Sequence, residues 1–148
     1  MKLKSLLYFS LLIHLFSCQN AKMNSGNLEV KEVEFEEVNH VNIRLIDSES
    51  KVLKSQTEIN NIYEIINANN PSPRKNPIPT FEENETYIVL QPNIEQLDFT
   101  VSKVSESNQN LEIKIQQYDN PEFKNKKHPA IIIKLNKKNY YNGVTIKK

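Results

Sequence analysis

The sequence predicts an α+β fold, with a small, mostly antiparallel sheet of about six or seven strands and one amphipathic helix packed on it. Several short runs alternate apolar with polar residues, as in Leu111-Glu112-Ile113-Lys114-Ile115, which is the period of a half-buried strand. Only residues 56–68 repeat apolar residues at helical spacing. Polar turns separate these segments, so each is expected to be one element.

The helix is predicted from both its start and its buried face. Ser55 and Glu58 have capping-box spacing, in which the Ser55 hydroxyl accepts from the amide of Glu58 and the Glu58 carboxylate reaches back. Asn69-Asn70-Pro71 marks the end. The apolar face is made by Ile59, Ile62, Tyr63, Ile65 and Ile66.

Two strands are expected at the beginning of the domain. Apolar residues alternate over 29–37 and again over 41–46, but in different phases. A phase change indicates a bulge or a short turn, and we place a turn near Asn39-His40. Residues 47–51 are expected to be a polar turn.

Acidic residues are concentrated in these first strands. Alternation places Glu32, Glu34 and Glu36 on one polar face, where they could take part in a metal or acid–base site or simply face solvent. We expect a solvated face because no histidine or aspartate cluster completes a metal site. The other end of the chain is basic: residues 101–148 contain ten basic and four acidic residues, including Lys124, Lys126, Lys127, Lys137 and Lys138. The acidic first strands and this basic segment could pair as cross-strand neighbours. Alternatively, the basic segment could bind anionic lipid or an acidic partner.

The second half of the chain reads as a series of strands. Residues 130–135, Ala-Ile-Ile-Ile-Lys-Leu, form a continuous apolar run and are expected to be buried on both faces. Asn142-Gly143 is a turn signal before the last strand. Further strands are expected at 85–91, 98–104, 111–115 and 144–146, with polar loops at 105–110 and 118–129.

A proline-rich segment, residues 70–80, follows the helix. Its prolines lack amide donors, which excludes helix and inner strand and favours an extended loop with polyproline character. Arg74 and Lys75 lie at its centre and Pro77 and Pro79 follow. The segment could be a recognition loop for an anionic or protein partner, or a connector between helix and strand.

The first seventeen residues have the features of a cleaved signal peptide. Lys2 and Lys4 precede an apolar core over 6–16, which is shorter than the about 20 residues of a membrane span. The small residue Ser17 before Cys18 resembles the lipobox of bacterial lipoproteins. The resemblance implies cleavage between Ser17 and Cys18 and a diacylglyceryl group on the Cys18 thiol, which would anchor the chain in the membrane.

The expected organisation is therefore a lipoprotein signal peptide over 1–17, an acylated cysteine with a flexible tether over 18–27, and one α+β domain over 28–148. Lipoproteins of the Bacteroidetes group that reach the cell surface carry acidic residues after the cysteine, whereas here Gln19 follows it. By this resemblance we expect an outer-membrane anchor with the domain facing the periplasm.

Composition argues against several function classes. Loss of Lys2 and Lys4 with the signal peptide lowers the formal net charge from +1 to −1, which does not suit a nucleic-acid binder. His40 and His128 are far apart, and no glycine-rich phosphate loop or nucleophile motif is present, so we expect no catalytic activity, cofactor or metal. A carboxylate pair combining Glu82 or Glu85 with Asp98 stays open as an alternative.

The order of elements also resembles a known family. A helix, the loop RKNPIPTF, the strands ETYIVL, DFTVSKV and LEIKI, and a final pair in HPAIIIKL and GVTI are similar to the C-terminal domain of protease-complex-subunit lipoproteins, the PrcB-like family. The resemblance covers residues 52–148, but the glycine pair and tyrosine typical of that family are missing from residues 93–99. It implies an accessory lipoprotein without catalytic activity that binds another envelope protein.

Two functional hypotheses follow from the sequence. The first is a lipid-anchored binding or accessory module that contacts another periplasmic or outer-membrane protein. The alternative is an inhibitor or immunity-type lipoprotein that blocks an enzyme at the envelope.

Overall fold

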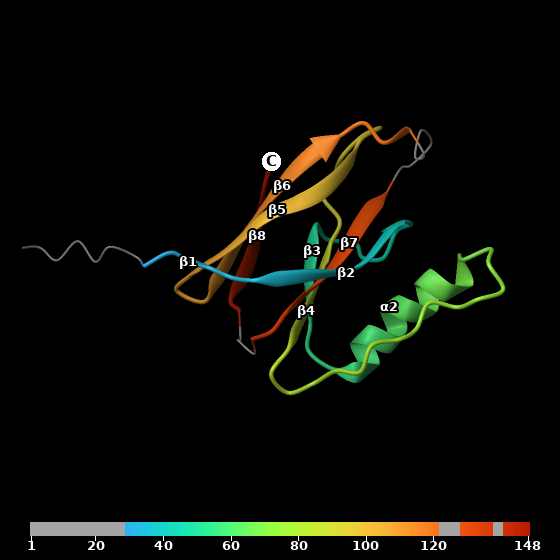
Figure 1. Ribbon diagram of the computed structural model, residues 1–148, viewed down its shortest axis with the longest axis horizontal. Helices are drawn as coiled ribbons and strands as arrows, with labels where there is room; N and C mark the ends of the chain where they lie inside the picture. The colour runs from blue at the N-terminus through green and yellow to red at the C-terminus, as the bar shows by residue number, and fades with distance from the viewer. Residues whose placement is uncertain (1–28, 122–127, 138–140) are drawn as a thin grey trace, which may run out of the picture.

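The computed structural model describes residues 29–121, 128–137 and 141–148. The fold is α+β, as expected, with mostly strands and one helix in the described part (Figure 1). In this part of the chain the strands form two four-stranded sheets, so the prediction of a single sheet of six or seven strands is wrong. No helix among the described residues is long and apolar enough to span a bilayer.

The central sheet has the order β2-β7-β4-β3 and is antiparallel throughout. The outer sheet has the order β1-β5-β6-β8, in which β8 runs parallel to β6. The central sheet consists of β2 (Phe35–Asn42), β3 (Ser50–Leu53), β4 (Thr86–Leu90) and β7 (Pro129–Leu135). The outer sheet consists of β1 (Lys31–Glu32), β5 (Asp98–Ser107), β6 (Asn110–Tyr118) and β8 (Gly143–Lys147).

The helix α2 (Gln56–Ala68) packs on the central sheet, which makes three layers. Its bounds confirm the predicted helix over 56–68, and the Ser55 side chain accepts from the amide of Glu58. The Glu58 carboxylate accepts from the amide of Lys54 at 2.7 Å, one residue before the cap. Local capping therefore sets the start of this helix.

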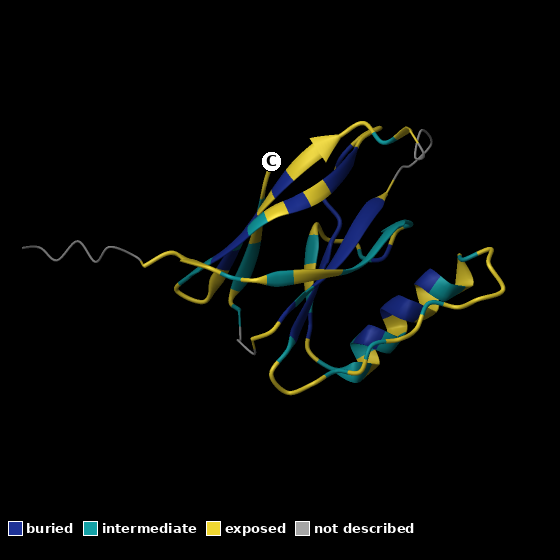
Figure 2. Cartoon of the chain, in the orientation of Figure 1, coloured by how far each residue is buried: buried dark blue, intermediate teal, exposed yellow. Residues whose placement is uncertain are grey.

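The two inner strands of the central sheet, β4 and β7, are buried on both faces (Figure 2). Along β7, Ile131, Ile133 and Leu135 pack between the two sheets, whereas Ala130 and Ile132 pack under α2. This alternation confirms the strand predicted to be buried on both faces, and it explains why 130–135 is apolar at almost every position.

The N-terminal segment is shared between the two sheets. β1 pairs with β5 in the outer sheet, and β2, beginning three residues later, pairs with β7 in the central sheet. The phase change in the sequence therefore marks two features: the passage between sheets and a β-bulge between Glu37 and Asn39. The predicted second strand over 41–46 and the turn at Asn39-His40 are wrong, because β2 continues through both residues to Asn42.

The hairpin of β5 and β6 confirms the expected pairing but has a tighter turn than predicted. Only Asn108 and Gln109 connect the strands, with φ of 48° and 60°. Positive φ at both residues is the geometry of a type I′ turn. The polar turn predicted for 47–51 is also shorter, because Ser50 and Lys51 already belong to β3.

Candidate functional site

The bulge in β2 turns two titratable side chains towards the outer sheet. Glu37 precedes the bulge and His40 follows it, and their register partners on β7 are Ile133 and Ile131, which both face the outer sheet. The extra residue, Val38, shifts the alternation of the strand, so residues of opposite parity share one face. Glu37 Oε1 consequently lies 3.5 Å from His40 Nδ1.

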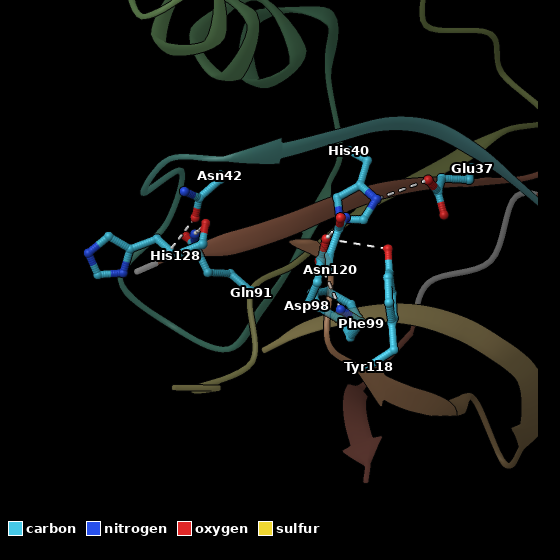
Figure 3. Close-up of polar contacts among 9 residues, drawn as sticks. All are labelled: Glu37, His40, Asn42, Gln91, Asp98, Phe99, Tyr118, Asn120 and His128. Carbon is cyan, nitrogen blue, oxygen red and sulfur yellow. Dashed lines mark hydrogen bonds and ion pairs between the residues drawn. The ribbon is translucent and has the colours of Figure 1, made fainter. Parts of the chain in front are cut away.

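The imidazole of His40, on the central sheet, contacts the carboxylate of Asp98, on the outer sheet (Figure 3). It is the first residue of β5 and its side chain is 1% exposed. Its Oδ1 lies 2.8 Å from His40 Nε2 and also accepts from the amide of Phe99 at 2.8 Å. Its Oδ2 accepts from Asn120 Nδ2 at 3.1 Å and from the hydroxyl of Tyr118 at 3.4 Å. We refer to Glu37, His40, Asp98, Tyr118 and Asn120 as the sheet-end cluster.

Hydrogen bonding keeps the Asp98 carboxylate ionised despite its burial. Burial opposes ionisation, but the amide of Phe99, the side chain of Asn120 and His40 together outweigh it and lower the pKa of Asp98 below its usual value of 3.8. Because an ionised carboxylate only accepts, Nε2 of His40 carries the proton in this contact. Burial and the neighbouring Asp98 raise the pKa of Tyr118.

A histidine bonded to a carboxylate, as His40 is to Asp98, is the arrangement of a general base and the acid that orients it. Here the bonds of the cluster also connect the two sheets. Within the described residues, Asp98 accepts from His40, Phe99, Tyr118 and Asn120, and these bonds join the start of β5 and the end of β6 to β2. Among the described residues, no group of three or more histidine, cysteine or acidic side chains could hold a metal ion. The cluster therefore fixes how the two sheets meet at this end.

The carboxylate pair considered in the sequence is not brought together by any described contact. Glu85 Oε2 accepts from the hydroxyl of Tyr87 at 3.1 Å, and Glu85 Oε1 lies 3.5 Å from Lys134 Nζ. Asp98 has different partners, chiefly His40. The His40–Asp98 pair was not predicted, because His40 was expected to lie in a turn. The phase change of the apolar residues near Val38 was the signal that could have indicated the bulge and, with it, the direction of the His40 side chain.

A second polar network surrounds Gln91, directly after β4 (Figure 3). Its Oε1 accepts from the amides of Leu45 and Ile46 at 2.9 and 3.1 Å, and its Nε2 donates to the carbonyls of Ile43 and His128 at 2.9 and 3.3 Å. The buried side chain thus holds the loop that follows β2. This loop borders a cavity of about 310 Å³ whose lining includes Arg44, Asp47, Glu49 and His128.

The proline-rich loop lies back along α2. Asn67 on the helix accepts from the amide of Asn76 at 2.7 Å and donates to its carbonyl at 3.2 Å. Near the start of the helix, Gln56 donates to the carbonyl of Pro79 and accepts from the amide of Phe81, at 3.1 and 2.7 Å. Side chains of α2 therefore bond to the loop backbone, as a neighbouring strand would in a sheet, and they hold this part of the loop extended.

The four loop residues singled out in the sequence do not form one cluster. Lys75 Nζ donates to the carbonyl of Asn67 at 2.6 Å, which caps the last turn of α2. Pro79 is half-buried beside Gln56, whereas Arg74 and Pro77 are exposed. Ile78, which sequence reasoning did not select, is 46% exposed next to Pro77.

The acidic first strands and the basic second half pair across strands where the structure describes both partners. Lys134 Nζ lies 2.8 Å from Glu36, and Lys103 Nζ lies 2.9 Å from Glu32. This confirms the cross-strand pairing considered above. Ser17 and Cys18, the tether, and Lys124, Lys126, Lys127 and Lys138 lie outside the described residues.

Comparison with known proteins identifies no relative. No protein-family model, no curated protein and no solved structure matches this chain. Lipidation of Cys18 and the similarity to the PrcB-like family accordingly stay predictions from the sequence.

Proposed function

We propose that the chain is a lipid-anchored binding or accessory module of the bacterial envelope, without catalytic activity, that contacts another periplasmic or outer-membrane protein. The anchor is the acylated Cys18 in the outer membrane, and the domain faces the periplasm. The contact is made by the proline-rich loop over 70–80. Two features support this function: the resemblance of Ser17-Cys18 to a lipobox, and the bonds that hold the loop along α2.

The observation that carries the proposal is that the loop is held extended yet exposed. Asn67 and Gln56 fix its backbone at two points along α2. Between and beyond these points, Arg74, Pro77 and Ile78 expose their side chains. A segment already in its bound conformation loses less conformational entropy on association, so pre-organisation of this kind favours binding.

The arrangement in space agrees with such a role. The first described residues lie at one end of the long axis, and the turn that follows α2 lies at the other (Figure 1). This turn is therefore well separated from the strand that would follow the tether. The sheet-end cluster joins the two sheets, and Gln91 holds the loop that follows β2.

Co-purification from detergent-solubilised membranes tests the proposal. The full-length chain would be compared with Cys18→Ala and with Asn67→Ala, which removes both bonds to Asn76. Asn61→Ala is the matched control, because Asn61 is exposed on the same helix and its side chain makes no hydrogen bond within the described part of the chain. Mass spectrometry would identify the lipid and any retained protein, and circular dichroism would confirm folding.

We expect an acylated Cys18 and a stoichiometric envelope protein with the wild type and with Asn61→Ala, and much less of that protein with Asn67→Ala. A retained enzyme whose activity falls on binding would favour the inhibitor alternative. An unmodified Cys18, or an acylated chain that purifies alone, would contradict the proposal. So would turnover of an envelope substrate that is abolished by a carboxylate substitution.

A further inference from the structure

The turn at the tip of the proline-rich loop holds one residue in place through its backbone. The amide of Arg74 donates to Ser72 Oγ at 3.2 Å, and the carbonyl of Arg74 accepts from Asn70 Nδ2 at 3.1 Å. Asn70 Oδ1 also accepts from the amide of Ser72 at 2.9 Å. Both polar backbone groups of Arg74 are therefore bound by side chains of its own turn.

The side chain of Arg74, unlike its backbone, is not held by its own turn. It is exposed, and its guanidinium makes no hydrogen bond or ion pair within the described residues. The neighbouring Lys75 ammonium is used in capping α2. The other arginine of the chain, Arg44, pairs with Asp47 at 3.2 Å.

The charge of Arg74 is also uncompensated along the sequence. Residues 65–81 contain no aspartate or glutamate. Elsewhere, Lys51, Lys103, Lys134 and Lys137 all have acidic partners. The tip of the loop is thus a positively charged point with no acidic residue near it in the sequence.

We propose that Arg74 is an anchor of the partner interface and binds a carboxylate on an acidic surface of the partner protein. A guanidinium binds a carboxylate through two parallel hydrogen bonds, and a fixed backbone reduces the entropy lost in forming them. A phosphate would satisfy the same donors, but the turn that follows α2 lies at the end of the domain opposite β1 (Figure 1), and the loop next to this turn exposes Pro77 and Ile78. These features favour a protein over lipid headgroups. The inference rests on the proposed function.

The test is co-purification of the full-length protein with its partner at low and at high salt. Arg74→Gln is expected to reduce the retained partner about tenfold or more at low salt. Arg74→Glu is expected to reduce it further, because a carboxylate would then face a carboxylate. Arg44→Gln is the matched control: it makes the same change on another exposed loop and leaves capture unchanged.

The outcomes separate this inference from the proposed function. If the partner is retained equally by wild type, Arg74→Gln and Arg74→Glu, the proposed function stands and the inference fails. If no protein accompanies the wild type, both fail. If Arg74→Gln weakens association with detergent micelles containing phosphatidylglycerol but leaves partner capture unchanged, Arg74 serves a lipid phosphate and the inference is overturned.

Discussion

His40 Nε2 and Asp98 Oδ1 lie 2.8 Å apart and join two sheets through residues that are 58 positions apart in the sequence. The imidazole also packs against Phe99, with ring centroids 6.2 Å apart. Because Asp98 is buried and accepts from four groups of the described residues, the pair is part of the connection between the layers rather than a surface contact.

Asp98→Asn should destabilise the fold by about 2–3 kcal/mol at pH 7, since the isosteric amide replaces an ionised acceptor and turns a donor towards other donors. Chemical denaturation would measure the change. Asp119→Asn, an exposed position close in sequence, should change the free energy of unfolding by less than about 0.5 kcal/mol. Equal effects of the two substitutions would contradict the buried role of Asp98.

The contribution of Asp98 should depend on pH with a defined sign. Its pKa in the fold is lowered below 3.8, so its ionised form stabilises the fold at pH values above its unfolded pKa. The stabilisation is expected to disappear as the pH falls through the folded pKa. Denaturation curves from pH 7 to pH 2 should therefore show wild type and Asp98→Asn converging in acid; a constant difference would be inconsistent with this linkage.

Gln91→Ala should cost about 2–4 kcal/mol, because it leaves the buried amide of Leu45 without its acceptor and frees the loop that follows β2. Gln116→Ala on β6 is the control, since Gln116 is exposed and its side chain makes no hydrogen bond within the described residues. Hydrogen exchange should show faster exchange at Leu45 and Ile46 in Gln91→Ala. Unchanged exchange there would mean that other contacts hold the loop.

Gln109→Gly should stabilise the protein by up to about 1 kcal/mol. Gln109 has φ of 60°, where glycine has no steric penalty, and the change creates Asn-Gly, the preferred pair for a type I′ turn. The substitution removes an exposed hydrogen bond of 3.3 Å, which Asn142 Nδ2 donates to Gln109 Oε1. Thermal unfolding would measure the gain; Gln117→Gly, within β6, should be destabilising instead.

Ser55→Ala should destabilise the fold by about 1 kcal/mol, because the Ser55 hydroxyl is the acceptor for the amide of Glu58 at the start of α2. Thr57→Ala, at an exposed position in the same turn, should not be destabilising. A smaller loss in Ser55→Ala than in Thr57→Ala would show that the cap does not stabilise the helix.

Elements governed by neighbouring residues could be read from the sequence. The capped helix over 56–68, the β5–β6 hairpin and the apolar strand that became β7 depend on periodicity, capping and local turn chemistry, all of which act over a few residues. The exposed backbone around Pro77, which follows the turn at 72–74, agrees equally with proline lacking an amide donor.

The division into two sheets and the sheet-end cluster could not be read in this way. The same alternation would suit one sheet or two, and only the pairing of β1 with β5 and of β2 with β7 separates them. A single bulge near Val38 reversed which side of β2 faces the outer sheet and thereby brought His40 to Asp98. Such contacts depend on which distant strands pair and in which register, and periodicity within one segment carries no information about either.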